Sequence, residues 1–327
     1  MAKKSAAARG HDCGDLAFDR AWLAPSYWST WLALGLLFLL SLLPARSRAY
    51  IGARGGDVAY KVNRKRRHIV RINLGLCFPT LSLAERERLV REHFQVMGIA
   101  MLDYGLLWFG SRRRIHAISD LIGEEHVRRS MDEGRNVIIM AGHSPGLEFG
   151  PMKLGEAGYP MIGPYNAGDN PIVDWLMARG RCRFGKQLFE RDTGMLTLTR
   201  MLRQGDVLFY LPDEDLGPEV TVFAPFFGVQ KATLYALGKL AKIGNAAVIP
   251  CMTFYDRELG RYQTHLLAPL DPFPTGEEVG DATLQNEAFE RLIRMYPAQY
   301  FWTLKIFRTR PAGERSPYKR ARTDAAT

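Results

Sequence analysis

A histidine and a glutamate five positions apart are the strongest candidates for chemistry in this chain. They end the segment His143-Ser-Pro-Gly-Leu-Glu148, which follows a short apolar run over residues 136–140. An imidazole can take a proton from a hydroxyl near neutral pH, and a carboxylate on its other ring nitrogen fixes the tautomer and stabilises the imidazolium that forms. The segment therefore predicts a general base, His143, that is oriented by Glu148. The alternative is a solvated loop histidine near a helix-start carboxylate.

The same segment also fits a different nucleophile. Residues 142–146 match the G-x-S-x-G elbow of hydrolases, in which Ser144 would attack and His265 would be the base further along the chain. Pro145 argues against this interpretation, because the elbow's oxyanion hole uses the backbone N–H that follows the nucleophile and proline has none. A general base is therefore preferred to a Ser144-dependent lipid hydrolase.

Two further charged segments follow predicted elements. Three acids, Asp213, Glu214 and Asp215, come directly after the apolar run 207–211. An Asp-x-Asp pair in this place could hold a divalent cation for a nucleotide-sugar donor, but no Gly-rich phosphate fingerprint accompanies it, and acids that cap a turn and pair with arginine are the alternative. A basic stretch over 179–186 includes Arg181, whose guanidinium could hold phosphate or steady an oxyanion, or simply add surface charge.

These residues must be positioned by alternating strands and helices. Short apolar runs predict strands over 136–140, 207–211, 246–251 and 262–267, and helical spacing predicts helices near 171–179, 193–203, 231–242 and 283–295. Ser82 and Glu85 form a capping box that opens a helix, and helical spacing continues to Phe109. The alternation implies an α/β fold. His143 then lies at the carboxyl end of a strand, where open α/β sheets place their ligand sites.

The N-terminal part of the chain differs from the rest. Residues 1–20 are small and polar and predict a flexible N-terminus, and no ionisable side chain occurs from Ala21 to Ala45. About 20 apolar residues span a bilayer, so residues 21–45 predict a membrane anchor helix, bracketed by Pro25 and Pro44, ahead of one domain over 46–327. Basic residues over 64–71 make the C-terminal flank of this predicted anchor richer in positive charge than its N-terminal flank, which favours a domain on the cytoplasmic side.

Charge and cysteine content narrow the classes of partner. The chain has 44 Lys and Arg against 34 Asp and Glu, a formal net charge of +10, which suits an anionic partner. Its basic runs flank hydrophobic segments instead of alternating with exposed aromatic residues, so nucleic acid is not an expected partner. The four cysteines are far apart, show no zinc-ligand spacing and predict a reduced domain without a metal site.

In their order and spacing, several segments resemble the late acyltransferases of lipid A biosynthesis, the lauroyl and myristoyl transferases. The resemblance covers most of the chain and includes the N-terminal hydrophobic segment. The segments that carry it are Asn73-Leu-Gly-Leu-Cys-Phe-Pro79, His143 to Glu148, Asp169-Asn-Pro171 through Arg181, Tyr210 to Pro218, Pro297-Ala-Gln-Tyr-Phe-Trp302 and Arg308-Thr-Arg-Pro311.

The resemblance implies both a fold and a reaction. The fold would be like that of glycerol-phosphate acyltransferases, the donor an acyl-carrier-protein thioester, and the acceptor a hydroxyl on the hydroxyacyl chains of a Kdo-bearing lipid A precursor at the inner membrane. No redox or nucleotide cofactor is implied. His143 and Glu148 match the family's catalytic pair, and Arg181 and Asp213 match two further residues associated with activity, as an oxyanion donor or substrate-binding groups.

The resemblance leaves the acyl chain length open. The segments 217–219, 231–234 and 317–320 look more like the myristoyl branch, whereas Glu at position 148 resembles the lauroyl branch. Chain length would be set by the depth of an apolar groove, in which one methylene changes discrimination by only about 1 to 3 kcal/mol.

Overall fold

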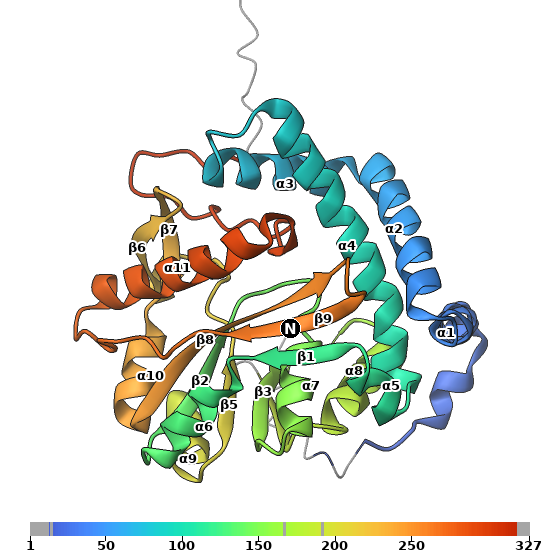
Figure 1. Ribbon diagram of the computed structural model, residues 1–327, viewed down its shortest axis with the longest axis horizontal. Coiled ribbons are helices and arrows are strands. Elements are labelled where there is room, and N and C mark those ends of the chain that lie inside the picture. Colours follow the sequence, from blue (N-terminus) through green and yellow to red (C-terminus); the bar gives the residue numbers. More distant parts are fainter. Residues whose placement is uncertain (1–12, 14–15, 166–167, 191–192, 319–327) are drawn as a thin grey trace, which may run out of the picture.

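A seven-stranded sheet forms the centre of the computed structural model, which describes residues 13, 16–165, 168–190 and 193–318 (Figure 1). Within this part of the chain the strand order is β1-β9-β8-β2-β5-β3-β4, and neighbours are parallel except for the antiparallel pair β8 and β9. The strands are β1 (Ser119–Ile122), β2 (Asn136–Ala141), β3 (Met161–Tyr165), β4 (Gln187–Glu190), β5 (Val207–Tyr210), β8 (Ala246–Asp256) and β9 (Arg261–Leu266).

Helices surround this sheet, and a hairpin lies beside it. The helices are α1 (Trp28–Ser41), α2 (Ala45–Val62), α3 (Arg64–Cys77), α4 (Leu83–Phe109), α5 (Arg112–His116), α6 (Glu124–Asp132), α7 (Phe149–Glu156), α8 (Pro171–Cys182), α9 (Met195–Arg203), α10 (Ala236–Gly244) and α11 (Glu278–Met295). The hairpin consists of β6 (Thr221–Phe226) and β7 (Val229–Leu234). Short 3-10 turns cover Arg20–Leu23, Pro25–Tyr27, Pro218–Val220 and Pro297–Gln299.

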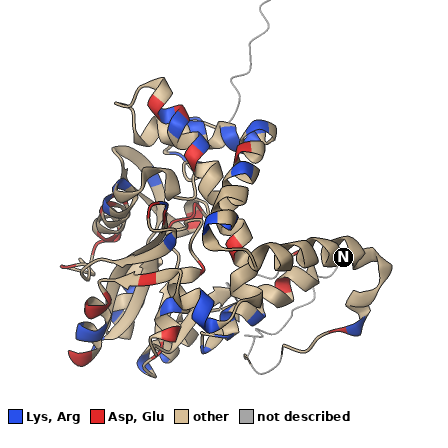
Figure 2. Ribbon diagram, turned by 45° about the vertical axis from the view of Figure 1, so that its right-hand side comes forward, with Lys and Arg blue, Asp and Glu red and all other residues tan. Residues whose placement is uncertain are grey.

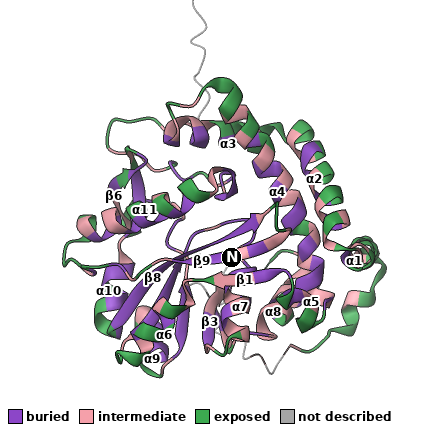
Figure 3. Cartoon of the chain, in the orientation of Figure 1, coloured by how far each residue is buried: buried purple, intermediate pink, exposed green. Residues whose placement is uncertain are grey.

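The core follows from the apolar composition of the central strands. In β2, residues Val137 to Ala141 are all buried, as is β8 from Ala246 to Tyr255 (Figure 3). A strand that is covered on both faces has a continuous run of apolar residues. Both strands could therefore be predicted from the sequence. The predicted strands and the α/β class are therefore confirmed, and the capping box is present, since Ser82 N donates to Glu85 Oε2 at 2.8 Å and Glu85 N to Ser82 Oγ at 3.2 Å.

Glycines allow α2 and α4 to pack closely. A Cβ atom built on Gly98 of α4 would lie 2.1 Å from the carbonyl oxygen of Gly52, and one on Gly56 would lie 2.2 Å from that of Phe94. Neither position can carry a side chain without separating the two helices. The pair runs along one side of the sheet, with α1 at its end (Figure 1).

The helix predicted over 231–242 is wrong in its first half. Residues 229–234 form β7, because Phe227 and Gly228 make a two-residue turn with φ of 50° and 76° that pairs this segment with β6. Positive φ at both turn positions is typical of the tight turns that match strand twist, and the Phe-Gly pair is a weak sequence signal for one. The helix itself begins only at Ala236.

The apolar N-terminal stretch is divided, contrary to the predicted single helix over 21–45. Pro25 begins a 3-10 turn and Pro44 precedes α2, so the continuous apolar helix α1 has 14 residues. Within the described residues, the structure contains no helix that is long and apolar enough to cross a bilayer. Of the flexible segment predicted over 1–20, residues 1–12 and 14–15 lie outside the described residues.

The predicted reduced state of all four cysteines is also not what the structure has. Cys13 and Cys182 form a disulfide, whereas Cys77 and Cys251 are free and buried. The reason is that the N-terminal segment folds back along α8: Leu16 packs near Cys182, and the indole of Trp175 donates to the Leu16 carbonyl at 3.0 Å. A spacing of 169 residues gave no hint of this contact.

Candidate active site

His143 and Asp213 meet because two neighbouring strands end together. β2 and β5 are parallel, and their register pairs Met140 with Tyr210, so His143 and Asp213 each lie three residues beyond a matched pair. Asp213 accepts two hydrogen bonds from His143, one from the backbone N–H at 2.7 Å and one from Nδ1 at 2.6 Å. The imidazole is thus fixed at Nδ1 by a carboxylate.

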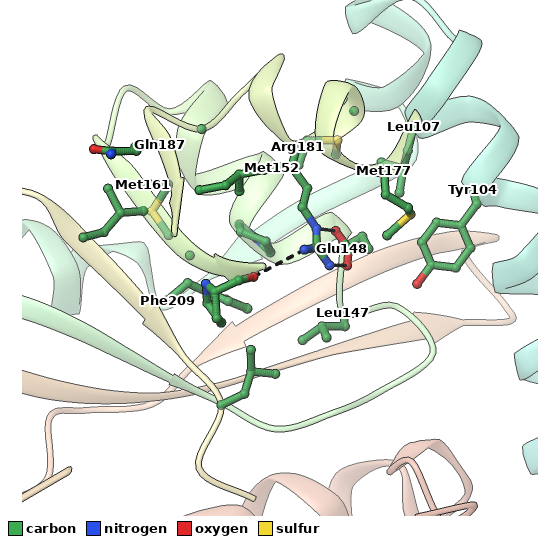
Figure 4. A pocket seen from close by; sticks show the side chains of 18 of the residues that line it. Tyr104, Leu107, Leu147, Glu148, Met152, Met161, Met177, Arg181, Gln187 and Phe209 are labelled. Atoms are coloured by element: carbon green, nitrogen blue, oxygen red, sulfur yellow. Dashed lines mark hydrogen bonds and ion pairs between the residues drawn. The ribbon is translucent and has the colours of Figure 1, made fainter. Parts of the chain in front are cut away.

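This arrangement corrects the predicted partner of His143. The carboxylate on Nδ1 belongs to Asp213, whereas both oxygens of Glu148 accept from Arg181, with Nε to Oε2 at 2.8 Å and Nη2 to Oε1 at 2.5 Å (Figure 4). Glu148 stands at the first turn of α7, and Arg181 lies in the last turn of α8. The four predicted residues therefore form two pairs, a histidine with an aspartate and a glutamate with an arginine.

The Asp213 carboxylate is the most buried member of the site. Only 1% of the residue is exposed, and burial by itself would raise the pKa of its carboxyl, but the positive charge and hydrogen bonds of His143 hold that pKa below its ordinary value. The imidazole of His143, by contrast, is 21% exposed. Its Nε2 lies 3.7 Å from Oε1 of Glu214. The ring is therefore anchored at Nδ1 by Asp213, has Glu214 near Nε2, and is partly exposed.

Lys231 is a buried cation near Asp213 that the sequence did not single out. It is 1% exposed, and its Nζ has no hydrogen-bond partner among the described residues but lies 5.7 Å from the centre of the Phe226 ring. Burial lowers the pKa of Lys231 to about 8, against the opposing effect of Asp213 and Asp215. A lysine inside the otherwise inward-facing segment 231–234 is the signal that could have identified it.

The Glu148–Arg181 pair is also shielded from water. The Glu148 side chain is 9% exposed and that of Arg181 is 28% exposed. Burial works against the charge of Arg181, but the bidentate contact with Glu148 raises the pKa of the guanidinium above its ordinary value. The nearby hydroxyl of Tyr104 has a raised pKa because it is buried and faces the charge of Glu148. The guanidinium of Arg181 is therefore held as a cation by its contact with Glu148.

Residues 300–301 brace the site from the C-terminal part of the chain. Phe301 N donates to the carbonyl of His143 at 2.9 Å, and the hydroxyl of Tyr300 donates to the carbonyl of Asp213 at 3.5 Å. Asn73, which is fully buried in α3, donates in turn to the Trp302 carbonyl at 2.7 Å. The segments 73–79 and 297–302 are thus structural supports for the two loops that carry His143 and Asp213.

Asp215 and Asn170 have similar supporting roles. Thr309 donates to the Asp215 carboxylate from its backbone N–H at 2.6 Å and from its hydroxyl at 2.7 Å. Asn170 caps α8 by accepting from the backbone of Ile172 and Val173. Asp213 and Asp215 therefore have different partners, and within the described residues no group of three His, Cys, Asp or Glu side chains is placed to hold a metal ion.

The geometry also argues against Ser144 as a nucleophile. Its side chain is buried and donates to the carbonyl of Thr253 at 2.6 Å. His265, the base expected for a hydrolase triad, lies on β9, and its Nε2 is buried without a hydrogen-bond partner among the described residues. The hydroxyl and the imidazole are therefore not arranged as an activated pair.

A narrow apolar cavity borders the Glu148–Arg181 pair (Figure 4). Leu147 and Leu211, from the loops that carry His143 and Asp213, line it together with Glu148, Arg181 and Gly163 of β3. The space is about 70 Å³, roughly half of the ~150 Å³ that holds a benzene molecule in an engineered cavity. Three methionines also line it, namely Met152, Met161 and Met177. Because methionine side chains repack easily, the cavity can adapt to a longer apolar ligand.

An imidazole held by a buried carboxylate, with an apolar cavity close to its loop, is suited to acyl transfer. Residues 16–309 match the family model described as bacterial lipid A biosynthesis acyltransferase, and the chain belongs to this family. It is an acyltransferase.

Curated relatives agree over nearly their full lengths. A lipid A biosynthesis acyltransferase of Haemophilus influenzae is 35% identical, with 91% of this chain and 93% of the relative covered. The lauroyltransferase of Escherichia coli K12 is 35% identical (92% and 98% covered), and its myristoyltransferase is 34% identical (93% and 94% covered). Among solved structures, the 1-acyl-sn-glycerophosphate acyltransferase PlsC of Thermotoga maritima is 14% identical, with a TM-score of 0.34 over 81% of this chain and 97% of that one.

We expect Asp213→Asn to lower turnover by about 100-fold or more, the usual scale for a positioned acid-base group, because an amide no longer fixes the imidazole tautomer. Turnover and circular dichroism of the purified variant are the measurements. Ser144→Ala is the control and should keep most of the activity. Near wild-type turnover in a folded Asp213→Asn enzyme would show that the carboxylate is not needed.

We expect Glu148→Gln to lower the free energy of unfolding by about 3 kcal/mol, because it leaves the charge of Arg181 partly buried without its partner. The double variant Glu148→Leu/Arg181→Met should lose less free energy of unfolding than Glu148→Leu alone and Arg181→Met alone lose together. Urea unfolding of Glu148→Gln, the two further single variants and the double variant tests this. Costs that simply add would show that the two side chains are not coupled.

Proposed function

We propose that this acyltransferase moves a lauroyl or myristoyl chain from acyl-carrier protein to a hydroxyl of a Kdo-bearing lipid A precursor. The observation that carries the proposal is the contact between Nδ1 of His143 and the buried Asp213, on an imidazole whose side chain is partly exposed. The family membership and the relatives' names support lipid A biosynthesis as the setting. We also propose that the sheet is of the glycerol-phosphate acyltransferase kind.

The chemistry starts at Nε2 of His143. With its proton on Nδ1 shared with Asp213, the neutral ring presents a lone pair at Nε2 that takes the proton of the acceptor hydroxyl. The hydroxyl oxygen forms a bond to the thioester carbonyl carbon, and the carbonyl oxygen becomes a tetrahedral oxyanion. Collapse of this intermediate breaks the carbon–sulfur bond, and the imidazolium returns its proton to the departing thiolate. The products are an ester and the free carrier thiol.

In this mechanism the four predicted residues have different roles. His143 is the catalytic base, and Asp213 is a positioning residue that holds the ring and stabilises the imidazolium. Glu148 and Arg181 act as one ion pair at the wall of the cavity, where the positive charge of Arg181 stabilises the oxyanion or binds substrate phosphate. Glu148 is needed because it fixes the guanidinium in place.

The apolar cavity beside this ion pair is the proposed site of the donor acyl chain. Its lining is mainly apolar, and the loops of both His143 and Asp213 reach it through Leu147 and Leu211. A chain entering there has its thioester at the mouth, next to the ion pair. The three methionines must move to admit the chain, so the length that is accepted depends on how far they repack.

We propose that the enzyme works on the cytoplasmic side of the inner membrane, with α1 embedded in the lipid surface. Large apolar side chains are exposed along α1, among them Trp28, Leu32, Leu36 and Leu39. A contiguous exposed apolar surface of this kind is unfavourable in water and favourable in lipid. Acyl-carrier protein is acidic and would dock on a basic face, so the transfer rate should fall as the salt concentration rises.

The direct test is transfer of a labelled lauroyl or myristoyl chain from acyl-carrier protein to a Kdo-bearing lipid A precursor by the purified full chain. We expect the wild-type protein to form labelled product and His143→Ala to be at least about 100-fold slower while remaining folded. Lysophosphatidic acid is the comparison acceptor. Transfer only to lysophosphatidic acid, or full activity of His143→Ala, would contradict the proposal.

Gly163→Leu tests the site of the donor chain. A Cβ on Gly163 would meet its nearest neighbour, Phe209 Cβ, at 3.9 Å, so a side chain fits at its base and extends into the cavity. In Gly163→Leu, we expect the ratio of kcat/KM for the myristoyl donor to kcat/KM for the decanoyl donor to fall by about tenfold. Gly163→Ala should lower this ratio by a smaller amount. An unchanged preference in the folded variant would place the donor chain elsewhere.

A further inference from the structure

A second, wider hollow lies between α2 and α4. Its volume is about 650 Å³, and its lining is mostly apolar. Glycines on both helices line it, and these include Gly52 and Gly98, where the helix backbones approach closely. Met97 and Met101 of α4 contribute flexible walls. We call this space the α2–α4 groove. Its apolar lining is suited to a hydrocarbon chain.

One part of the α2–α4 groove reaches the catalytic base. Phe301 lines the groove, its backbone N–H donates to the carbonyl of His143 at 2.9 Å, and its ring lies 6.3 Å from the imidazole between centres. The narrow cavity lined by Glu148 and Arg181 contains none of these groove residues. Two separate apolar spaces are therefore lined by neighbours of His143, the narrow cavity by Leu147 of the same loop and the groove by Phe301.

Another part of the groove is cationic. Arg66 of α3 lines it and is held by a hydrogen bond from Nη1 to the carbonyl of Thr303 at 3.1 Å. Arg64 and Lys65 precede it at the start of the same helix and are exposed. Lys and Arg residues, blue in Figure 2, gather around α3 at the top of the view. An apolar groove with arginine beside it is complementary to a lipid that has an anionic headgroup.

The groove also opens onto a surface that is suited to lipid. Ile51 and Met101, which line it, are 37% and 63% exposed, and Val58 and Val62 of α2 are 59% and 71% exposed. These side chains would be covered by the membrane that the exposed face of α1 contacts. These exposed apolar side chains give a hydrocarbon chain an apolar surface beside the groove.

From these observations we infer that the α2–α4 groove holds the acyl chain of the acceptor lipid that bears the reacting hydroxyl, with the anionic headgroup region beside Arg66. The inference rests on the proposed function, in which the attacked thioester and the attacking hydroxyl are both carried on hydrocarbon chains. Two such chains must converge on one imidazole, and the narrow cavity and the groove provide a separate apolar space for each. The acceptor takes the wider space because that space has the larger volume, the exposed Arg66 and the opening to lipid, whereas Arg181 in the narrow cavity is paired with Glu148.

Gly55 offers a direct test because it lines the groove and a Cβ there would meet nothing within 4 Å. Gly55→Leu should therefore fold normally and place a branched side chain in the groove. We expect the KM for the Kdo-bearing acceptor to rise by about tenfold or more, since several buried methylenes are displaced. The KM and chain-length preference for the acyl-carrier-protein donor should stay unchanged, and Gly55→Ala should give a smaller effect of the same kind.

Gly35→Leu is the matched control, because Gly35 is also an exposed helical glycine with nothing within 4 Å of an added Cβ, but lies on α1 outside the groove. It should leave both KM values unchanged. If Gly55→Leu does not fold, Met101→Trp fills the same space from the other helix. An unchanged acceptor KM in a folded groove variant, or an altered donor preference, would overturn the inference. Absence of transfer by the wild-type protein would instead contradict the proposed function.

Discussion

The hydrogen bond between His143 and Asp213 is the interaction on which the proposed chemistry depends. It exists because β2 and β5 are neighbours in the sheet and end in register, so that residues 70 positions apart extend from matched strand ends. Hydrogen bonds to main-chain carbonyls hold the geometry around it: Phe301 and Tyr300 donate to the carbonyls of the two residues, and Asn73 donates to the segment that supplies them. An imidazole fixed in this way loses little freedom when a substrate binds.

The charged groups around this pair are buried or partly buried, and the carboxylates of Asp213 and Glu148 have partners of opposite charge. Asp213 is almost fully buried, yet its pKa is held down by the imidazole, with a smaller contribution from the buried Lys231. Glu148 and Arg181 form a separate ion pair that lines the narrow cavity. In a site enclosed by apolar walls, such charges act on a developing oxyanion more strongly than they would in water. The apolar spaces near His143 are then suited to the hydrocarbon parts of the substrates.

Much of the fold could be predicted from the sequence, because buried parallel strands such as 136–141 and 246–256 are continuous apolar runs. The four candidate residues could also be named from the sequence, but their pairing could not. Glu148 is close to His143 in sequence, whereas Asp213 becomes its partner only through strand order and register, which apolar periodicity does not encode. The same limit applies to Lys231, to the turn at Phe227 and Gly228, and to the contact of Cys13 with Cys182, each of which depends on tertiary neighbours.

A double-mutant cycle on His143 and Asp213 measures this central interaction most directly. Turnover of acyl transfer would be determined for His143→Ala, Asp213→Ala and the double variant, with circular dichroism to confirm that each is folded. If Asp213 acts through the imidazole, the double variant will be about as slow as His143→Ala alone, since the carboxylate has nothing left to position. Losses that multiply in the double variant would show that the two residues act independently and would contradict the account.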